Sequence, residues 1–209
     1  MKDHLAALRE EYTHAGLSEA DLAPDPFAMF GRWFADAAEL AEPNAMVLAT
    51  VSPAGQPSSR MVLLKGVDAR GFAFFTNLGS RKATDLAANP RCSLLFPWHG
   101  LQRQVRVEGV AELLDRDEVA AYFSTRPRGA QLGAWASPQS SVVTSDELSA
   151  RFAGADANYP GDVPAPDFWG GYVVRPRSVE FWQGRQNRMH DRLRYRREGD
   201  TWLTERLAP

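Results

Sequence analysis

Short runs of β-branched and aromatic residues, separated by turn sequences, restrict the fold of this chain more than any other feature. Residues 45–51, 58–67 and 71–76 form three such runs, and the intervening residues 52–55 and 68–71 carry Gly together with Pro, Ser or Asp. Strand-sized runs joined by tight turns favour antiparallel pairing, because a parallel pair needs a long crossover. The pattern therefore predicts an antiparallel meander.

Further predicted strands lie in the middle of the chain and near its C-terminus. In residues 104–114, Val105 and Val107 alternate with Gln104 and Arg106, as expected for a strand with one buried and one polar face. Because strands and helices seldom alternate one by one, we expect a mainly β fold, a small antiparallel barrel with attached helices. The other predicted strands are 92–98, 169–176, 178–184, 192–197 and 201–207.

Residues typical of helix N-termini precede several of the segments that are not predicted strands. Asp25 followed by Pro26 has the form of an N-cap and a first helical residue. Capping-box spacing occurs twice, in Asp115 with Glu118 and in Thr144 with Glu147. The predicted helices cover residues 5–12, 27–41, 80–88, 119–126 and 148–153.

Length and charge limit the class of protein. With 209 residues, 44% of them hydrophobic, we expect one domain spanning 1–209, with an N-terminal helical segment at 1–41. A net charge of -2 without a basic tract gives no sign of a nucleic-acid partner. The N-terminus lacks the apolar core of a secretion signal, and no stretch is long enough to cross a bilayer. We therefore expect a cytoplasmic protein with no membrane partner.

An anion site is predicted where residues 76–82 leave a strand and enter a helix. A helix N-terminus offers free backbone amides, Thr76 and Ser80 add hydroxyls, and Arg81 and Lys82 add positive charge. A capped helix with solvated basic residues is an equally good interpretation of this segment alone. The segment has neither a Walker A loop nor a dinucleotide fingerprint.

Two other groups of cations are candidates for the same chemistry. Arg60 and Lys65 bracket an apolar run, and residues five apart in a regular strand point to opposite faces, so they should serve different anions. Tyr122 and Arg126 are four apart on a predicted helix and can converge on one phosphate, with Arg128 close by. Taken alone, the first group is better explained as a buried strand with charged ends, and the second as an ordinary surface pair of Tyr and Arg.

The stretch from residue 179 to residue 192 is the most specific in the chain, because it concentrates aromatic, imidazole and guanidinium groups. Arg188 and His190 would share one face if this segment were extended. The four histidines of the chain show no ligand spacing, so no metal site is expected. No G-x-S-x-G elbow accompanies His190, which leaves a serine hydrolase without support.

With these features in place, the sequence resembles the pyridoxamine 5'-phosphate oxidase family along nearly its whole length. The resemblance implies an FMN-binding split β-barrel, a homodimer with FMN between its subunits, and O2 as electron acceptor. It also implies phosphorylated vitamin B6 substrates, pyridoxamine and pyridoxine 5'-phosphate, and pyridoxal 5'-phosphate as product. The blocks that carry the resemblance are residues 60–65, 74–82, 93–99, 139–141, 168–171 and 180–192.

The resemblance also implies roles for individual residues. Arg188 and His190 are the expected catalytic residues, orienting the carbon that gives up a hydride to the flavin. The expected FMN contacts are Arg60, Met61, Val62, Leu63, Leu64, Lys65, Phe75, Thr76, Arg81, Lys82, Gln104, Gln139, Ser140, Trp182 and Arg192. The expected substrate contacts are Arg9, Tyr12, Lys65, Tyr122, Arg126, Arg188 and His190.

Some positions depart from the family pattern. Ala130 stands where a phosphate-binding serine is expected, and Glu10 stands where a second arginine is expected. The first change removes a hydroxyl donor, and the second brings negative charge towards an anionic substrate. Both changes concern affinity more than the type of reaction. The competing hypotheses are another flavin enzyme of the same barrel group and a non-catalytic carrier of FMN or pyridoxal phosphate.

Overall fold

The computed structural model describes residues 16–209. The helix predicted at 5–12 lies outside this part of the chain, as do Arg9, Glu10 and Tyr12. Within the described residues, no helix is both long and apolar enough to span a bilayer.

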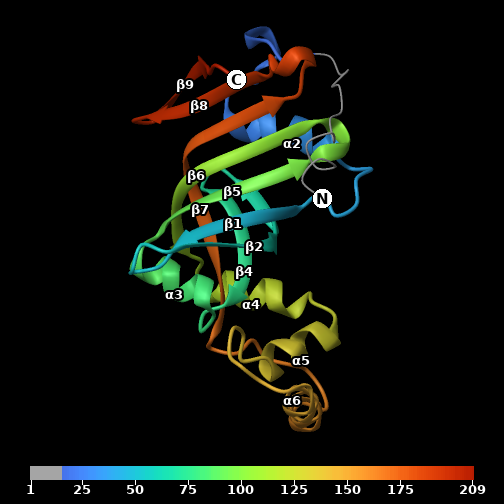
Figure 1. Ribbon diagram of the computed structural model, residues 1–209. Helices are drawn as coiled ribbons and strands as arrows, with labels where there is room; N and C mark the ends of the chain where they lie inside the picture. Colours follow the sequence, from blue (N-terminus) through green and yellow to red (C-terminus); the bar gives the residue numbers. More distant parts are fainter. Residues whose placement is uncertain (1–15) are drawn as a thin grey trace, which may run out of the picture. The chain divides into compact units, whose positions relative to one another are not determined.

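Nine strands form a mainly antiparallel sheet (Figure 1). Hydrogen bonding orders them β2-β1-β5-β6-β7-β4-β3, with β8 paired to β7 and β9 paired to β8. The strands predicted at 192–197 and 201–207 are confirmed as the paired β8 and β9, whereas the two strands predicted at 169–176 and 178–184 are one continuous strand, β7. The strands are β1 (Ala45–Val51), β2 (Pro57–Leu63), β3 (Gly66–Asp68), β4 (Gly71–Asn77), β5 (Arg91–Trp98), β6 (Arg103–Leu113), β7 (Trp169–Gln183), β8 (Asp191–Glu198) and β9 (Thr201–Arg206).

The predicted meander is confirmed in part. β1 pairs with β2, and β3 pairs antiparallel with β4 across the predicted turn at 68–71, but β1 also pairs with β5 and β4 also pairs with β7. The run 58–67 is also not one strand, because β2 ends before Leu64, which is buried at 7% exposure. The chain resumes at Lys65, whose amide donates to the Ala73 carbonyl at 2.8 Å. Because Leu64 is buried in the core, the predicted run 58–67 does not continue as a single strand.

The helices begin close to the predicted positions, although their caps differ. Asp25 caps α2 as predicted by accepting hydrogen bonds from the amides of Phe27 and Ala28. The Thr144 capping box before α6 is confirmed. Asp115 makes no side-chain cap bond, so the other capping box is wrong. The α-helices are α2 (Pro26–Asp36), α3 (Arg81–Ala88), α4 (Arg116–Ser124), α5 (Arg128–Ala136), which was not predicted, and α6 (Ser145–Asn158).

A competing ion pair explains why Asp115 and Glu118 do not form the predicted capping box. The Glu118 carboxylate accepts two hydrogen bonds of 3.0 Å from Arg70 and does not reach back to the start of α4. A charge-assisted bidentate contact outweighs a single contact to a backbone amide. The spacing of residues along the chain predicted the start of α4, but a tertiary contact determined which partner the Glu118 side chain binds.

The chain divides into two compact units. One unit holds the described residues up to Val47, with Ser93–Glu108 and Pro176–Pro209, and the other holds Leu48–Cys92 and Gly109–Arg175. The predicted single domain 1–209 stays a prediction. In the first unit, an aromatic core includes edge-to-face contacts of Phe30 with Phe96 at 4.9 Å between ring centroids.

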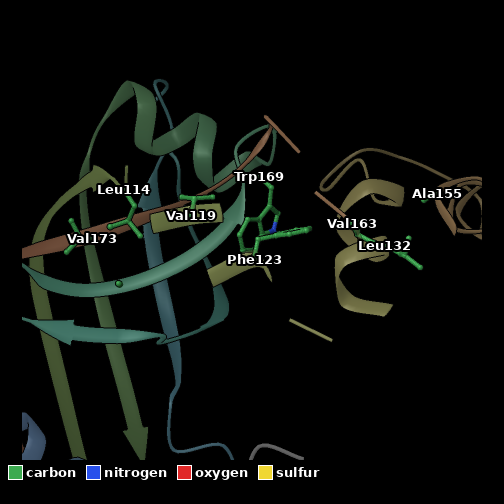
Figure 2. Packing of buried hydrophobic residues seen from close by; sticks show 9 residues of the cluster. Leu114, Val119, Phe123, Leu132, Ala155, Val163, Trp169 and Val173 are labelled. Carbon is green, nitrogen blue, oxygen red and sulfur yellow. The ribbon is translucent and has the colours of Figure 1, made fainter. Parts of the chain in front are cut away.

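The second unit has its own buried cluster, built where α4, α5 and α6 meet the paired strands β4 and β7 (Figure 2). Trp169, the first residue of β7, packs edge-to-face on Phe123 of α4 with ring centroids 4.8 Å apart. α5 packs against α6 in the same unit. The cluster comprises Ala73, Leu114, Val119, Phe123, Leu132, Ala155, Val163, Trp169 and Val173.

Candidate functional site

A cavity of about 660 Å³ opens in the unit formed by residues 48–92 and 109–175. Its size is within the range of small-molecule sites, and its walls combine aromatic rings with a few cations. The lining residues come from β2, β4, α3, α4, α5, the start of β7 and the loops beside them. They are Met61, Val62, Leu63, Lys65, Phe75, Thr76, Asn77, Lys82, Tyr122, Thr125, Arg126, Pro127, Ala130, Gly133, Ala134, Ser137, Gln139 and Trp169.

Lys82 is a buried cation at one side of this cavity, with 8% of its surface exposed. Its Nζ donates to Gln139 Oε1 at 2.6 Å, to Thr76 Oγ1 at 3.1 Å and to Ser80 Oγ at 3.2 Å. All three partners are neutral. Burial, with a smaller contribution from the positive charge of Arg60, lowers the pKa of Lys82 to about 8. The site is therefore short of negative charge.

Arg60 lies outside the cavity lining and is held by the structure itself. Its guanidinium donates to Thr50 Oγ1 at 2.7 Å and to Ser58 Oγ at 2.9 Å, and it lies 4.0 Å from the Asp85 carboxylate. Lys65, by contrast, lines the cavity. Arg60 and Lys65 thus lie in different surroundings, although β2 ends before Lys65; that they serve different anions stays a prediction.

The start of α3 differs from the predicted phosphate cradle. The Gly79 amide donates to Asn77 Oδ1 at 2.7 Å, and the Arg81 amide donates to Ser140 Oγ at 3.2 Å. Ser80 is fully buried and does not cap the helix with its side chain. These two amides already have partners within the protein and are not free in the way that the predicted cradle requires.

Arg126 and Tyr122 both line the cavity. The helix predicted to carry both ends earlier, because α4 stops at Ser124 and Arg126 lies just beyond it. The Nη1 atom of Arg126 is buried and has no hydrogen-bond partner among the described residues. Burial lowers the pKa of Arg126, and the nearby Tyr122 raises it by a smaller amount. A buried donor without an acceptor is costly, so Arg126 is a candidate contact for a ligand that accepts hydrogen bonds. Arg128 instead binds Asp156 and the loop after α6.

A second, smaller pocket of about 220 Å³ lies in the other unit. One of its lining residues is Glu180, a carboxylate with 5% exposure. Glu180 accepts from Arg192 at 2.7 Å and 3.1 Å and from Arg106 at 2.7 Å. The hydrogen bond to Glu180 raises the pKa of Arg192. The pocket is lined by Gln104, Arg106, Glu180, Trp182, Arg192 and Pro209.

His190 and Arg188 lie beside this pocket, but the segment is not extended as the alternation argument assumed. Residues Gln186–Arg188 form a 3-10 turn, and Asn187 and Arg188 have positive φ values of 56° and 60°. The imidazole of His190 packs against Trp182 with 4.7 Å between ring centroids. Its Nδ1 accepts the Arg185 amide at 3.1 Å, so the neutral ring carries its proton on Nε2. Burial and then Arg188 lower the pKa of His190.

The predicted site residues thus fall into separate groups. The larger cavity gathers Met61, Val62, Leu63, Lys65, Phe75, Thr76, Lys82, Tyr122, Arg126 and Gln139. The second pocket gathers Gln104, Trp182 and Arg192, with His190 packed against Trp182. The predicted residues that line neither pocket are Arg60, Leu64, Arg81, Ser140, Arg188 and His190.

Sequence reasoning missed several lining residues. Glu180 and Trp169 both lie in blocks that carry the family resemblance, yet neither was assigned a role. Arg106 appeared only as the polar face of a strand. Among residues 16–209, no cluster of His, Cys, Asp and Glu could hold a metal ion.

Solved structures agree with this fold. PhzG from Burkholderia lata 383, in complex with tetrahydrophenazine-1-carboxylic acid, aligns with a TM-score of 0.89 at 32% identity, covering 96% of this chain and 100% of that one. A pyridoxamine 5'-phosphate oxidase-related, FMN binding protein from Nostoc punctiforme aligns with a TM-score of 0.75 at 18% identity, covering 90% and 100%. The fold is a mainly β split barrel with attached helices.

Sequence comparison identifies the family. A family model described as "Pyridoxamine 5'-phosphate oxidase" matches residues 35–153, and one described as "Pyridoxine 5'-phosphate oxidase C-terminal dimerisation region" matches residues 169–209. Pyridoxine/pyridoxamine 5'-phosphate oxidase from Nocardioides sp. is 65% identical over 98% of both chains. The Rubrobacter xylanophilus protein of that name is 59% identical over 98% of this chain and 96% of its own. This chain belongs to the pyridoxamine 5'-phosphate oxidase family of oxidoreductases.

Proposed function

We propose that this chain is an FMN-dependent oxidase that converts pyridoxamine 5'-phosphate and pyridoxine 5'-phosphate to pyridoxal 5'-phosphate, with O2 as electron acceptor. The observation that carries this proposal is Arg126, which lines a cavity of about 660 Å³ and has no ion-pair partner among residues 16–209. A substrate phosphate would supply the anionic partner. Relatives at 53–65% identity carry the corresponding name.

The residues present fit a flavin phosphate. Lys82 is buried among three neutral oxygen acceptors and has no carboxylate within ion-pair distance among residues 16–209. Arg60 and Arg81 add positive charge near it. A buried cation with a lowered pKa is stabilised by a nearby phosphate, since the anion favours its charged form. FMN, when bound, accepts two electrons from the substrate and passes them to O2.

The proposed role of each residue follows from the contacts described above. Lys82, Thr76 and Gln139 hold the flavin phosphate, and Lys65, Tyr122 and Arg126 hold the phosphate of the substrate. Arg188 and His190 orient the reacting carbon, with His190 donating through Nε2 in its neutral form. Arg192, fixed by Glu180, presents positive charge towards the flavin ring.

The active form is proposed to be a homodimer. The match of residues 169–209 to a dimerisation region supports this assembly. The family arrangement puts one flavin against both subunits, so each site would combine Lys82 of one copy with Arg192 of the other. A soluble, cytoplasmic location without nucleic-acid or membrane partners fits the composition.

A turnover experiment tests the proposal. The purified protein is expected to be yellow after reconstitution with FMN and to release FMN, not FAD, on denaturation. Adding pyridoxamine 5'-phosphate in air should yield pyridoxal 5'-phosphate and hydrogen peroxide in equal amounts. Flavin binding without turnover would favour a carrier, and turnover of an unphosphorylated ring acid alone would favour a different oxidase of this barrel group.

A further inference from the structure

Three nearly parallel aromatic rings stack on one another in the lining of the larger cavity. Phe75 and Tyr122 stack at 4.0 Å with an interplanar angle of 13°. Trp169 continues the layer, 5.4 Å from Phe75 at 5° and 6.1 Å from Tyr122 at 8°. All three line the cavity. Trp169 was not assigned a role from the sequence, although it is the most buried of the three, at 6% exposure.

The Arg126 guanidinium packs against Trp169 and against the neighbouring ring of Phe123. Its guanidinium carbon lies 4.8 Å from the ring centroid of Trp169 and 5.4 Å from that of Phe123. The two rings are held edge-to-face, side by side in Figure 2. A cation over an aromatic face is attracted most strongly by tryptophan, and more strongly when it is shielded from water.

No other group in the described chain holds this guanidinium. Arg126 forms no ion pair with a carboxylate of residues 16–209, and its buried Nη1 has no hydrogen-bond partner there. Most other arginines of the chain are fixed by carboxylates, as Arg192 is by Glu180. The ring faces therefore fix the position of Arg126 while leaving its donors available. A carboxylate partner would fix the side chain too, but it would compete with an anionic ligand.

We infer that Trp169 is a positioning residue that sets the selectivity for phosphorylated substrates by holding Arg126 in the cavity. This inference rests on the proposed function, since it needs the substrate phosphate to bind Arg126. The indole ring of Trp169 holds the Arg126 guanidinium in position without neutralising its charge. The backbone of Trp169 is anchored separately, through its pairing with Asn77 in β4 and a 2.8 Å hydrogen bond from Arg116 to its carbonyl.

The test is a double-mutant cycle on the FMN-loaded protein. Trp169→Met removes the ring face and keeps an apolar side chain, Trp169→Phe keeps a smaller ring, and Arg126→Ala removes the guanidinium. KM and kcat are measured for pyridoxamine 5'-phosphate, with unphosphorylated pyridoxamine as the reference substrate. The dissociation constant of pyridoxal 5'-phosphate, measured by calorimetry, gives a readout that is independent of turnover.

Trp169→Met is expected to raise KM and the dissociation constant for the phosphorylated compounds by roughly threefold to thirtyfold, the range of a partly buried cation–π contact. The effect on unphosphorylated pyridoxamine should be much smaller, and Trp169→Phe should retain most of the affinity. In the Arg126→Ala background, Trp169→Met should change KM by less than about twofold, since the two residues act as one unit.

Additive losses in the double variant, or equal losses for both substrates, would overturn the inference and give Trp169 a general packing role. If Arg126→Ala weakens phosphate binding while Trp169→Met does not, the inference fails and the proposed function survives. If Arg126→Ala leaves the kinetics of the phosphorylated substrate unchanged, the phosphate assignment itself is wrong. Should Trp169→Met not fold, Phe123→Leu removes the second ring under Arg126, and its effect must likewise vanish in the Arg126→Ala background.

Discussion

Lys82 and Gln139 are joined by a 2.6 Å hydrogen bond from the lysine Nζ to the amide Oε1. The amide oxygen is the nearest acceptor to a buried ammonium that has no negatively charged partner in the described chain. Such a group loses its proton more easily than a solvated lysine, and the pKa of Lys82 is about 8. Its charge state therefore changes within an accessible pH range.

The affinity of the FMN-free protein for FMN should fall as the pH rises above about 8. The flavin phosphate stabilises the charged lysine and raises its pKa in the complex, so binding takes up a proton above the free pKa of about 8. The loss approaches about tenfold per pH unit between the two pKa values. Quenching of flavin fluorescence measures the dissociation constant from pH 6.5 to 9.5.

Lys82→Arg is the control for this pH dependence, because a guanidinium stays charged throughout the range. Its FMN affinity should be nearly constant over the same interval, whatever its absolute value. A flat profile for the unmodified protein would show that Lys82 does not set the affinity.

Ala130→Ser is expected to tighten the binding of pyridoxamine 5'-phosphate by about 1 kcal/mol, or roughly fivefold in KM. Ala130 lines the same cavity as Arg126, so an added hydroxyl can donate to the substrate phosphate. Ala121→Ser, on the exposed side of α4, serves as the matched control and should have no effect. An unchanged KM in Ala130→Ser would mean that the substrate phosphate lies out of reach of α5.

Glu180→Gln should destabilise the protein by roughly 1–3 kcal/mol, because Arg106 and Arg192 would lose the buried carboxylate that they share. Glu205 provides the comparison, since it also binds two arginines but its side chain is 30% exposed. Glu205→Gln should cost less than about 1 kcal/mol. Urea unfolding of the FMN-free protein gives both values, and equal costs would contradict the importance of burial at Glu180.

Gly71→Ala should prevent correct pairing of β4 with β7. Gly71 has a φ of 149°, and a Cβ atom there would lie 2.0 Å from the carbonyl oxygen of Val174. We expect a loss of more than about 2 kcal/mol in unfolding free energy. Gly66→Ala in the adjacent β3, where the nearest atom is 3.7 Å away, should change stability by less than about 0.5 kcal/mol. Similar losses in both variants would argue against the close approach at Gly71.

A subunit-mixing experiment tests the proposed shared site. Lys82→Ala and Arg192→Ala should each abolish activity alone, and exchange of subunits between them should restore about a quarter of the original activity. This follows because half of the dimers would be mixed, each with one intact and one doubly altered site. No recovery despite demonstrated exchange would place both contacts within one subunit.

Local signals in the sequence were sufficient for most elements and for part of the site. Short β-branched and aromatic runs located β1 and β5, alternation of apolar and polar residues located β6, and Asp25 with Pro26 located α2. The four-residue spacing of Tyr122 and Arg126 put both in one cavity. These features depend on neighbours within a few residues, so short-range pattern is enough to predict them.

Short-range sequence patterns did not predict the contacts between segments that are distant along the chain. The pairing of β4 with β7, nearly a hundred residues apart along the chain, was not predicted. Arg70 drew Glu118 away from its capping box. In both cases several partners were locally acceptable, and burial and charge selected among them only after the chain had folded.

The sequence by itself determined the mainly β class, most helix starts and the residue types available for binding anions. Only the tertiary structure decided which cations are neutralised and which remain available. Arg192 is paired with Glu180, whereas Arg126 lies on the ring of Trp169 with a buried donor unused. The physical reason is that a charged side chain binds whichever partner the fold brings within a few ångströms, and linear spacing does not encode that distance.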